Sequence, residues 1–304
     1  MTSATLGPLL AEARADGRAL GAFNVITLEH AQAVAAGAAR AGVPAVLQLS
    51  QNAVAHHGGE LAPLAAALTA LAHAAPVPLA LHLDHLDDGP LGRRLLREAP
   101  EAGFGSVMFD GSALPAEENV AATAAAVAFG REHGLAVEAE LGRIGGKPGD
   151  AHTPGVRTDP GEAAEFVAAT GVAALAVAVG SSHAMTVREA ALDQPLIAEL
   201  RAAVGVPLVL HGSSGVPDEE LRAAVRSGMT KINVGTALNV ALTGAVRQRL
   251  VDEPGLVDPR RYLADGRTAM TETVARLLAV LHGAAPAVPS ARALPADGIS
   301  PRPR

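Results

Sequence analysis

The chain has 304 residues, of which 49% are hydrophobic and 18% are charged, so it can bury a large core beneath an ordinary polar surface. A net charge of −7 and an aromatic content of 2% argue against a nucleic-acid partner, which needs a basic surface and stacking rings. Because the sequence contains no cysteine, disulfides, thiolate metal sites and cysteine nucleophiles are excluded, and any metal must be bound by His, Asp or Glu.

The first segment, residues 1–17, alternates Leu and Ala with charged residues, as a short amphipathic helix does. It lacks the apolar core of a signal peptide. The most apolar stretch of the chain, residues 166–180, is too short to span a bilayer and is interrupted by Thr170 and Gly171. We therefore expect a cytoplasmic protein without a membrane partner.

Eight repeats of one pattern follow, each with a short run of Val, Leu, Ile and Ala, then polar residues, then a longer Ala-rich segment. The predicted strands cover residues 20–23, 44–49, 78–83, 106–109, 136–141, 173–179, 207–210 and 231–234. The predicted helices cover about residues 27–41, 60–74, 90–102, 117–133, 160–170, 195–204, 217–228 and 237–250. Strands that alternate with helices pair in parallel, and eight such units close into a barrel more readily than they form an open sheet. The sequence therefore predicts an α/β protein, a (β/α)8 TIM barrel.

One extra C-terminal helix is predicted at about residues 259–282, outside the barrel. The chain after this helix is rich in Ala, Pro and Arg, a composition that does not form a core. We therefore predict a single barrel domain over residues 1–283, followed by a disordered tail over residues 284–304.

Polar side chains leave the predicted strands at their carboxyl ends, the face on which barrel enzymes carry their chemistry. In chain order they are Asn24, Ser50, Asp84 with His85, Asp110, Glu138 with Glu140, His183, His211 and Asn233. Closure of the barrel can bring His85, His183 and His211 together, and three histidines with one open position are typical of a catalytic zinc site. The alternative, in which each histidine is only a hydrogen-bonded residue near a strand end, explains any one of them better than all three.

Carboxylates accompany these histidines. Asp84 directly precedes His85, where it can orient a ligand, bind a metal or exchange a proton with a substrate hydroxyl. Asp110 and Glu140 can bind a second metal ion, support the first, or form structural salt bridges. His82 lies deeper in its strand, so we interpret it as a packed imidazole that supports the site.

A phosphate site is indicated by the last two strands. The seventh ends in His211-Gly212-Ser213-Ser214-Gly215, and the eighth in Asn233-Val234-Gly235-Thr236. Glycine lets backbone N–H groups approach an anion, and Ser and Thr hydroxyls complete its coordination. A Gly-Ser-Ser-Gly sequence alone is usually a flexible turn, but its position behind a proposed zinc ligand, in the seventh of eight units, favours phosphate binding.

Seven segments together resemble the class II fructose- and tagatose-bisphosphate aldolases, and the similarity runs from about residue 6 to about residue 283. They are Gly21-Ala22-Phe23-Asn24, His82-Leu83-Asp84-His85, residues 102–108, Glu117-Glu118-Asn119-Val120, Glu138-Ala139-Glu140-Leu141-Gly142, residues 206–215 and Lys231-Ile232-Asn233-Val234. Each segment alone is a weak signal, whereas the set is specific.

The resemblance implies a role for each matching residue. It implies catalytic Zn²⁺ bound by His85, His183 and His211, and Asp84 as the acid and base that acts on the substrate hydroxyl. It implies an alternative metal position, for a second divalent ion, at Asp110 and Glu140. The dihydroxyacetone phosphate site would comprise Gly212, Ser213, Ser214, Asn233, Val234, Gly235 and Thr236, with further substrate contacts from Asn24 and Ser50.

Such chemistry needs no amine nucleophile, because zinc polarises the ketone and stabilises the enediolate. The chain contains two lysines, Lys147 and Lys231. Lys231 begins its predicted strand and should therefore lie at the wrong end of the barrel for a Schiff base.

Two departures from the family pattern concern the substrate. The family usually has His-Gly and an aromatic residue where this chain has His183-Ala184-Met185-Thr186, which alters a backbone contact of Ala184 to phosphate or to a monovalent cation. The family's acidic loop is replaced by Gly145-Gly146-Lys147-Pro148-Gly149-Asp150, in which Asp150 is the available carboxylate. Both changes spare the metal ligands and bear on the second sugar phosphate.

The sequence thus predicts a zinc-dependent aldolase that reversibly cleaves a ketose 1,6-bisphosphate, of fructose or tagatose type, to dihydroxyacetone phosphate and glyceraldehyde 3-phosphate. Alternatives are an aldolase for another phosphorylated ketose or sugar acid, a zinc hydrolase in which the metal activates water, and a non-catalytic homologue. The expected partner is a phosphorylated small-molecule sugar. The resemblance also implies a homo-oligomer, a dimer or a tetramer.

Overall fold

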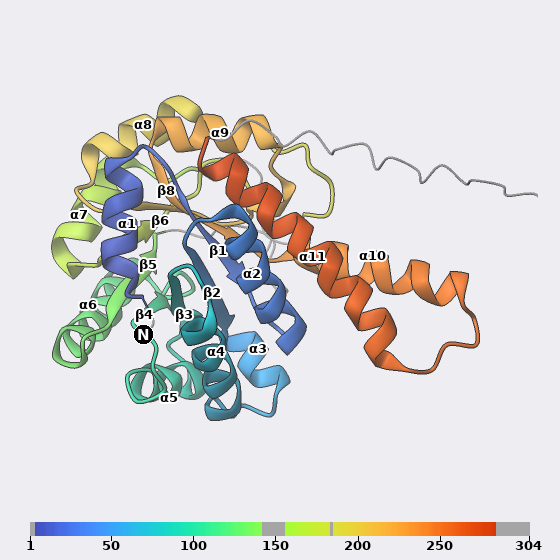
Figure 1. Cartoon of the computed structure of the whole chain (residues 1–304). Coiled ribbons are helices and arrows are strands. Elements are labelled where there is room, and N and C mark those ends of the chain that lie inside the picture. The colour runs from blue at the N-terminus through green and yellow to red at the C-terminus, as the bar shows by residue number, and fades with distance from the viewer. Residues whose placement is uncertain (1–3, 142–155, 183–184, 284–304) are drawn as a thin grey trace, which may run out of the picture.

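A computed structural model describes residues 4–141, 156–182 and 185–283 (Figure 1). Eight parallel strands form a closed barrel in chain order, which confirms the predicted fold. The strands are β1 (Leu20–Asn24), β2 (Ala45–Ser50), β3 (Leu79–Asp87), β4 (Ser106–Asp110), β5 (Ala136–Glu140), β6 (Ala174–Ala176), β7 (Leu208–Leu210) and β8 (Met229–Val234). The barrel closes where β1 pairs with β8, with Leu20 opposite Lys231 and Phe23 opposite Val234.

Helices follow the strands and surround the barrel (Figure 1). They are α2 (Leu28–Ala41), α3 (Gln51–His56), α4 (Ala62–Ala74), α5 (Pro90–Glu98), α6 (Ala116–His133), α7 (Pro160–Thr170), α8 (Gln194–Ala203), α9 (Asp218–Ser227), α10 (Thr236–Asp252) and α11 (Pro259–Leu281). A single turn of 3-10 helix, η1 (Ser213–Gly215), follows β7. The short helix α3 was not predicted. It begins after Ser50, whose hydroxyl accepts a hydrogen bond from the Ala53 N–H at 3.2 Å.

The side chains inside the barrel form an apolar layer below a polar one. Alternate residues of a strand face the same side, so every second residue of a barrel strand points inward. The apolar layer contains Leu20, Ala22, Val46, Ala80, Ala174, Ala176 and Val209, and it packs against α1 (Leu6–Ala15) through Leu6, Leu9 and Leu10. Helix α1 therefore closes the amino-terminal end of the barrel and leaves the polar layer to face the carboxyl-terminal mouth.

Two strand boundaries that affect the site differ from the prediction, namely the carboxyl end of β3 and the amino end of β8. Strand β3 continues through Asp84 and His85 to Asp87, although the predicted strand ended at residue 83. Strand β8 begins at Met229, so the prediction that Lys231 begins its strand is wrong. The side chain of Lys231 lies inside the barrel, where it is fully buried. In the described part of the chain, no helix is long and apolar enough to cross a membrane.

The extra C-terminal helix is confirmed as α11, which packs against α2 and α10. Helix α10 and part of α11 extend together beyond the barrel (Figure 1). The contact between α2 and α11 is close at Gly37, where an added Cβ atom would lie 2.6 Å from Cβ and Cγ1 of Val274. Glycine is therefore required at this helix crossing because a larger side chain would not fit, and not because of its backbone conformation.

Gly37→Ala is expected to lower the free energy of unfolding by about 1–3 kcal/mol, because the added methyl group overpacks the contact with Val274. Denaturant unfolding would measure the change. Gly7→Ala is the matched control, since Gly7 also lies in a helix but has no atom within 4 Å of the added Cβ. There, alanine should stabilise the helix by roughly 0.5–1 kcal/mol. Equal stability of the two variants would contradict the close approach of α2 and α11.

Candidate functional site

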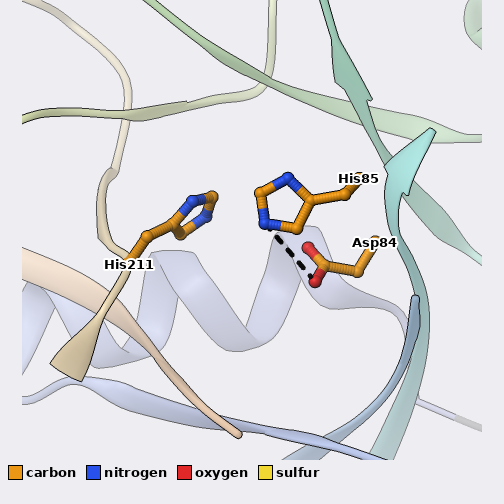
Figure 2. A group of neighbouring side chains, drawn as sticks. All are labelled: Asp84, His85 and His211. Carbon is orange, nitrogen blue, oxygen red and sulfur yellow. Dashed lines mark ion pairs between the residues drawn. The ribbon is translucent and has the colours of Figure 1, made fainter. Parts of the chain in front are cut away.

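Two histidines and one carboxylate converge at the mouth of the barrel. Asp84, His85 and His211 each offer one ligand atom, and these atoms all lie within 4.8 Å of one another (Figure 2). Asp84 and His85 come from β3, and His211 follows β7. Imidazole nitrogen and carboxylate oxygen are donors that suit a divalent transition metal such as zinc. The structure thus brings together two of the three predicted zinc ligands.

A bulge in β3 explains how two consecutive residues share this site. In a regular strand, Asp84 and His85 would point to opposite faces. Here the pairing of β3 with β4 shifts register between Leu83 and Leu86, and His85 has a φ of 52°. A non-glycine residue in this region stores about 1–3 kcal/mol of backbone strain, and such strain is found mainly at functional sites. The bulge turns both side chains toward the mouth.

His85 is oriented by Asp110. Its Nδ1 lies 3.0 Å from Asp110 Oδ2, while Asp110 Oδ1 accepts hydrogen bonds from the Ser112 hydroxyl at 2.5 Å and the Ser112 N–H at 3.2 Å. The Nε2 of His85 lies 3.8 Å from Asp84 Oδ2. A carboxylate on one ring nitrogen fixes the ring orientation and leaves the other nitrogen for a metal. Among the roles predicted for Asp110, support of a first metal ligand is the one that this geometry favours.

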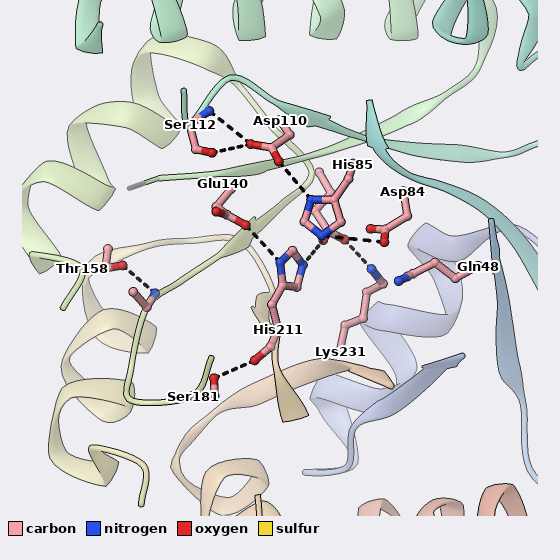
Figure 3. A network of polar contacts seen from close by, with 12 residues as sticks. Gln48, Asp84, His85, Asp110, Ser112, Glu140, Thr158, Ser181, His211 and Lys231 are labelled. Atoms are coloured by element: carbon pink, nitrogen blue, oxygen red, sulfur yellow. Dashed lines mark hydrogen bonds and ion pairs between the residues drawn. The ribbon is translucent and has the colours of Figure 1, made fainter. Parts of the chain in front are cut away.

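His211 lies between two carboxylates. Its Nδ1 is 3.0 Å from Glu140 Oε2 (Figure 3), and its Nε2 is 3.3 Å from Glu138 Oε1. Burial alone would lower the pKa of His211, but the hydrogen bonds to Glu138 and Glu140 outweigh burial and raise the pKa to about 9. The metal-free ring is therefore protonated at neutral pH, and a metal ion must displace a proton from it.

Asp84 is buried and hydrogen-bonded on one side. Its Oδ2 accepts from Asn24 Nδ2 at 3.2 Å, and Asn24 Oδ1 accepts from Gln48 Nε2 at 3.3 Å. Burial would raise the pKa of Asp84, but His85, His211 and Lys231 together lower it below its usual range. Its Oδ1 has no hydrogen-bond partner in the described part of the chain. An ionised carboxylate with one available oxygen is suited to accept a proton from a substrate.

A second tier of polar residues lies directly beneath this cluster. Lys231 Nζ donates to Glu138 Oε2 at 2.8 Å, and His82 Nδ1 lies 2.9 Å from the Ser106 hydroxyl. All four residues are buried. Burial, reinforced by Lys231, lowers the pKa of His82 to about 3, so this imidazole is neutral, as expected of a packed residue.

Three residues of the site had no predicted role, namely Gln48, Glu138 and Lys231. Each lies two residues before a predicted site residue in the same strand: Gln48 before Ser50, Glu138 before Glu140, and Lys231 before Asn233. Because residues two apart face the same side of a strand, this spacing was the signal that could have identified them.

The two predicted phosphate loops meet at the amino terminus of α10. The Ser213 hydroxyl donates to the Asn233 carbonyl oxygen, and the Ser214 hydroxyl accepts from the Ala237 N–H at 3.0 Å. Gly212 has a φ of 67°, and a Cβ there would lie 2.4 Å from the Ser182 carbonyl oxygen. Both amide atoms of Asn233 are buried without a hydrogen-bond partner in the described residues. A helix amino terminus beside unpaired buried amide groups is suited to an anion or a polar substrate.

The remaining predicted residues are placed as follows. Asn24 ends β1, and Ser50 ends β2 and caps α3. Val234 ends β8, Gly235 precedes α10, and Thr236 begins it. His183 and Ala184, and the segment containing Lys147 and Asp150, lie outside the described residues. The proposed third zinc ligand therefore stays a prediction.

The closed barrel and the side chains at its carboxyl-terminal mouth define this protein as a (β/α)8-barrel enzyme with a candidate metal site. A family model described as fructose-bisphosphate aldolase class-II matches residues 4–285. The chain belongs to this family, and it is an aldolase, a carbon–carbon lyase.

Solved structures agree with this assignment. The YdjI aldolase from Escherichia coli K12 is 30% identical, covers 92% of this chain and 97% of its own length, and superposes with a TM-score of 0.79. A candidate fructose-1,6-bisphosphate aldolase from Coccidioides immitis is 31% identical over 90% of this chain and 94% of its own, with a TM-score of 0.78. The fructose-bisphosphate aldolase of Campylobacter jejuni shares the fold, with a TM-score of 0.79. It is 22% identical and covers 92% of this chain and 95% of its own length.

Proposed function

We propose that this protein is a zinc-dependent aldolase that reversibly cleaves a ketose 1,6-bisphosphate to dihydroxyacetone phosphate and glyceraldehyde 3-phosphate. The observation that carries the proposal is the convergence of Asp84, His85 and His211, whose ligand atoms lie within 4.8 Å of one another. The family membership and the name of the structure from Coccidioides immitis support the substrate class.

His85 and His211 would hold the zinc ion, with His183 as the predicted third ligand. When bound, zinc supplies a Lewis acid that polarises the ketone and stabilises the negative charge of the three-carbon fragment. Asp110 on His85, and Glu138 with Glu140 on His211, keep the two imidazoles oriented toward the mouth. These carboxylate–imidazole pairs thus orient the proposed metal ligands.

Asp84 would act on the substrate hydroxyl. Asn24 occupies Oδ2, so Oδ1 is the oxygen available to take the proton. As the O–H bond breaks, its electrons form the aldehyde carbonyl, and the adjacent carbon–carbon bond breaks with its electrons left on the three-carbon fragment. Protonation of that fragment completes dihydroxyacetone phosphate. The predicted acidic residue for this second proton transfer is Asp150.

The phosphate of the three-carbon fragment would bind between the loops after β7 and β8. Gly212, Ser213 and Ser214 form one side, and Asn233 to Thr236 form the other, at the amino terminus of α10. Asn24 and Ser50 lie at the neighbouring strand ends of β1 and β2, where they would contact the rest of the sugar.

A substrate panel run before and after chelation tests the proposal. Fructose and tagatose 1,6-bisphosphates should release triose phosphate, detected by coupled reduction, and chelation should abolish the release until Zn²⁺ is restored. Release that persists in the chelated protein would contradict zinc dependence. Formation of inorganic phosphate without triose phosphate would instead indicate hydrolysis.

One observation favours a variant of this function. The sequence departs from the family pattern at Ala184 and at the segment ending in Asp150, both of which bear on the second phosphate and not on the metal. If a zinc-loaded protein cleaves neither bisphosphate, an aldolase for another phosphorylated ketose or sugar acid is the better assignment.

We also propose that the protein is a homo-oligomer that pairs through α10. Leu238 is its one buried residue, whereas Val240 is 51% and Val251 71% exposed. These two valines are 251 − 240 = 11 residues apart, about three helical turns, so they lie on the same side. Apolar residues aligned on a projecting helix favour burial against a partner.

Val251→Glu is expected to lower the molar mass measured by light scattering toward that of one chain, 30.5 kDa, because it places a charge in the proposed interface. Val187→Glu is the control, since Val187 is 60% exposed but lies outside α10. A wild-type mass of one chain would contradict the proposed oligomer.

A further inference from the structure

We propose that Glu138, anchored by Lys231, is a positioning residue that holds a proton on Nε2 of His211 and thereby presents Nδ1 to the metal. The inference rests on the proposed metal site and adds a residue to it. Glu138 divides its two oxygens between the two partners: Oε1 lies 3.3 Å from His211 Nε2, and Oε2 accepts from Lys231 Nζ at 2.8 Å.

The burial of this pair argues against a purely structural role. Glu138 is 2% exposed, and Lys231 and His211 are both 0% exposed. A buried ion pair costs desolvation free energy, and an apolar pair of similar volume is often equally or more stabilising. The pair therefore needs another reason to lie beneath the site, and the contact of Glu138 with His211 supplies one.

Lys231 fixes the position of the Glu138 carboxylate beside His211. Lys231, from β8, holds Oε2 of Glu138, so Oε1 is kept at Nε2 of His211. Glu140 lies at the end of β5, nearer the mouth, and contacts Nδ1 at 3.0 Å. A histidine that donates one ring proton to a fixed carboxylate has a defined tautomer and a more basic second nitrogen. Nδ1 is thus the nitrogen that a metal would bind.

Glu138→Gln should exchange donor and acceptor in the hydrogen bond between residue 138 and Nε2 of His211. Lys231 presents only donors, so the amide oxygen of the variant must face Nζ and its NH₂ group must face Nε2 of His211. The NH₂ group requires an acceptor at Nε2, which moves the ring proton to Nδ1. We expect the dissociation constant for Co²⁺ to rise about 10–100-fold, as is typical when a partner of a metal ligand is lost.

Adding Lys231→Met should restore binding. Without the ammonium group, the amide can turn its oxygen to Nε2 of His211 and its NH₂ group to His82. Nε2 of His82 lies 4.0 Å from Glu138 Oε2 and has no hydrogen-bond partner in the described residues, so it can accept this bond. The double variant E138Q/K231M should therefore bind Co²⁺ more tightly than E138Q, although it has lost one more charge.

A variant with an apolar pair at these two positions tests whether the acceptor for His211 is needed. E138L/K231M buries no charge and has similar volume to E138Q/K231M, but it lacks the acceptor for Nε2 of His211. E138L/K231M should bind Co²⁺ about 10–100-fold more weakly than E138Q/K231M, and circular dichroism of both double variants would show that each is folded. The visible absorption bands of bound Co²⁺ should differ from wild type in E138Q and E138L/K231M, and return in E138Q/K231M.

The measurements separate the two proposals. Wild-type protein that does not bind Co²⁺ would contradict the metal site itself. Wild-type binding together with unchanged affinity and spectrum in E138Q, or equal affinities of the two double variants, would contradict only the role of Glu138.

Discussion

Asp84→Asn is expected to lower kcat for sugar bisphosphate cleavage by about 10²–10⁴-fold, the usual contribution of a positioned acid or base. The amide keeps the size of the side chain and its place beside Asn24, but it cannot take a proton. Steady-state rates would give kcat, and Co²⁺ titration would give metal affinity. Unchanged metal affinity with lost turnover is the predicted pattern.

The same pair of measurements distinguishes the two roles open to Asp84, whose carboxylate is also one of the three converging ligand groups. Loss of metal affinity in parallel with kcat would make it a metal ligand and not the base. Asp218→Asn is a control carboxylate. Arg188 and Arg276, the partners of Asp218, lie outside the site, so kcat of the Asp218→Asn variant should match that of the wild type.

Metal affinity is expected to increase about tenfold for each pH unit from pH 7 to about pH 9, because the metal must displace a proton from His211. The pKa of this residue is raised to about 9, against burial, by Glu138 and Glu140. A histidine with the ordinary pKa of about 6.5 is already neutral in this window, so the change isolates His211. Titration with buffered Zn²⁺ at several pH values would measure it.

The sign of the stability effect in the metal-free protein follows from the same pKa. A pKa raised in the folded state stabilises the protein fully below the unfolded value of 6.5, and this stabilisation is lost as the pH rises to about 9. Glu140→Gln removes one of the two carboxylates and should move both transitions to lower pH. Metal affinity that is constant between pH 7 and pH 9 would contradict a protonated His211.

The predicted strands were recognised because each combines an apolar run with polar residues at its carboxyl end, and this pattern is local in the sequence. The same pattern placed Asn24, Ser50, Asp110 and Glu140 at strand ends, where the structure has them. What it could not show is where a strand is irregular. The bulge at His85, with its φ of 52°, is set by the pairing of β3 with β4 and leaves no residue-type signal.

Contacts between inward-facing side chains of different strands also could not be predicted from local sequence patterns. Glu138 and Lys231 are 93 residues apart, yet their side chains meet at 2.8 Å because both point into the barrel, from β5 and from β8. The sequence placed Lys231 at the start of its strand, whereas the pairing of β8 with β7, which begins at Met229 opposite Leu208, shows that Lys231 lies two residues further in. Ser213 and Ser214, predicted to bind phosphate, also join the β7 and β8 loops.

Local sequence patterns were enough to predict eight strand–helix units and a set of histidines and carboxylates without cysteine, and the resemblance of seven segments was enough to indicate the family. Which of these groups face one another, and therefore which imidazole nitrogens contact carboxylates, is known only from the folded barrel. The physical reason is that apolar periodicity is a property of each segment, whereas hydrogen bonding and pKa inside a barrel depend on partners contributed by opposite walls.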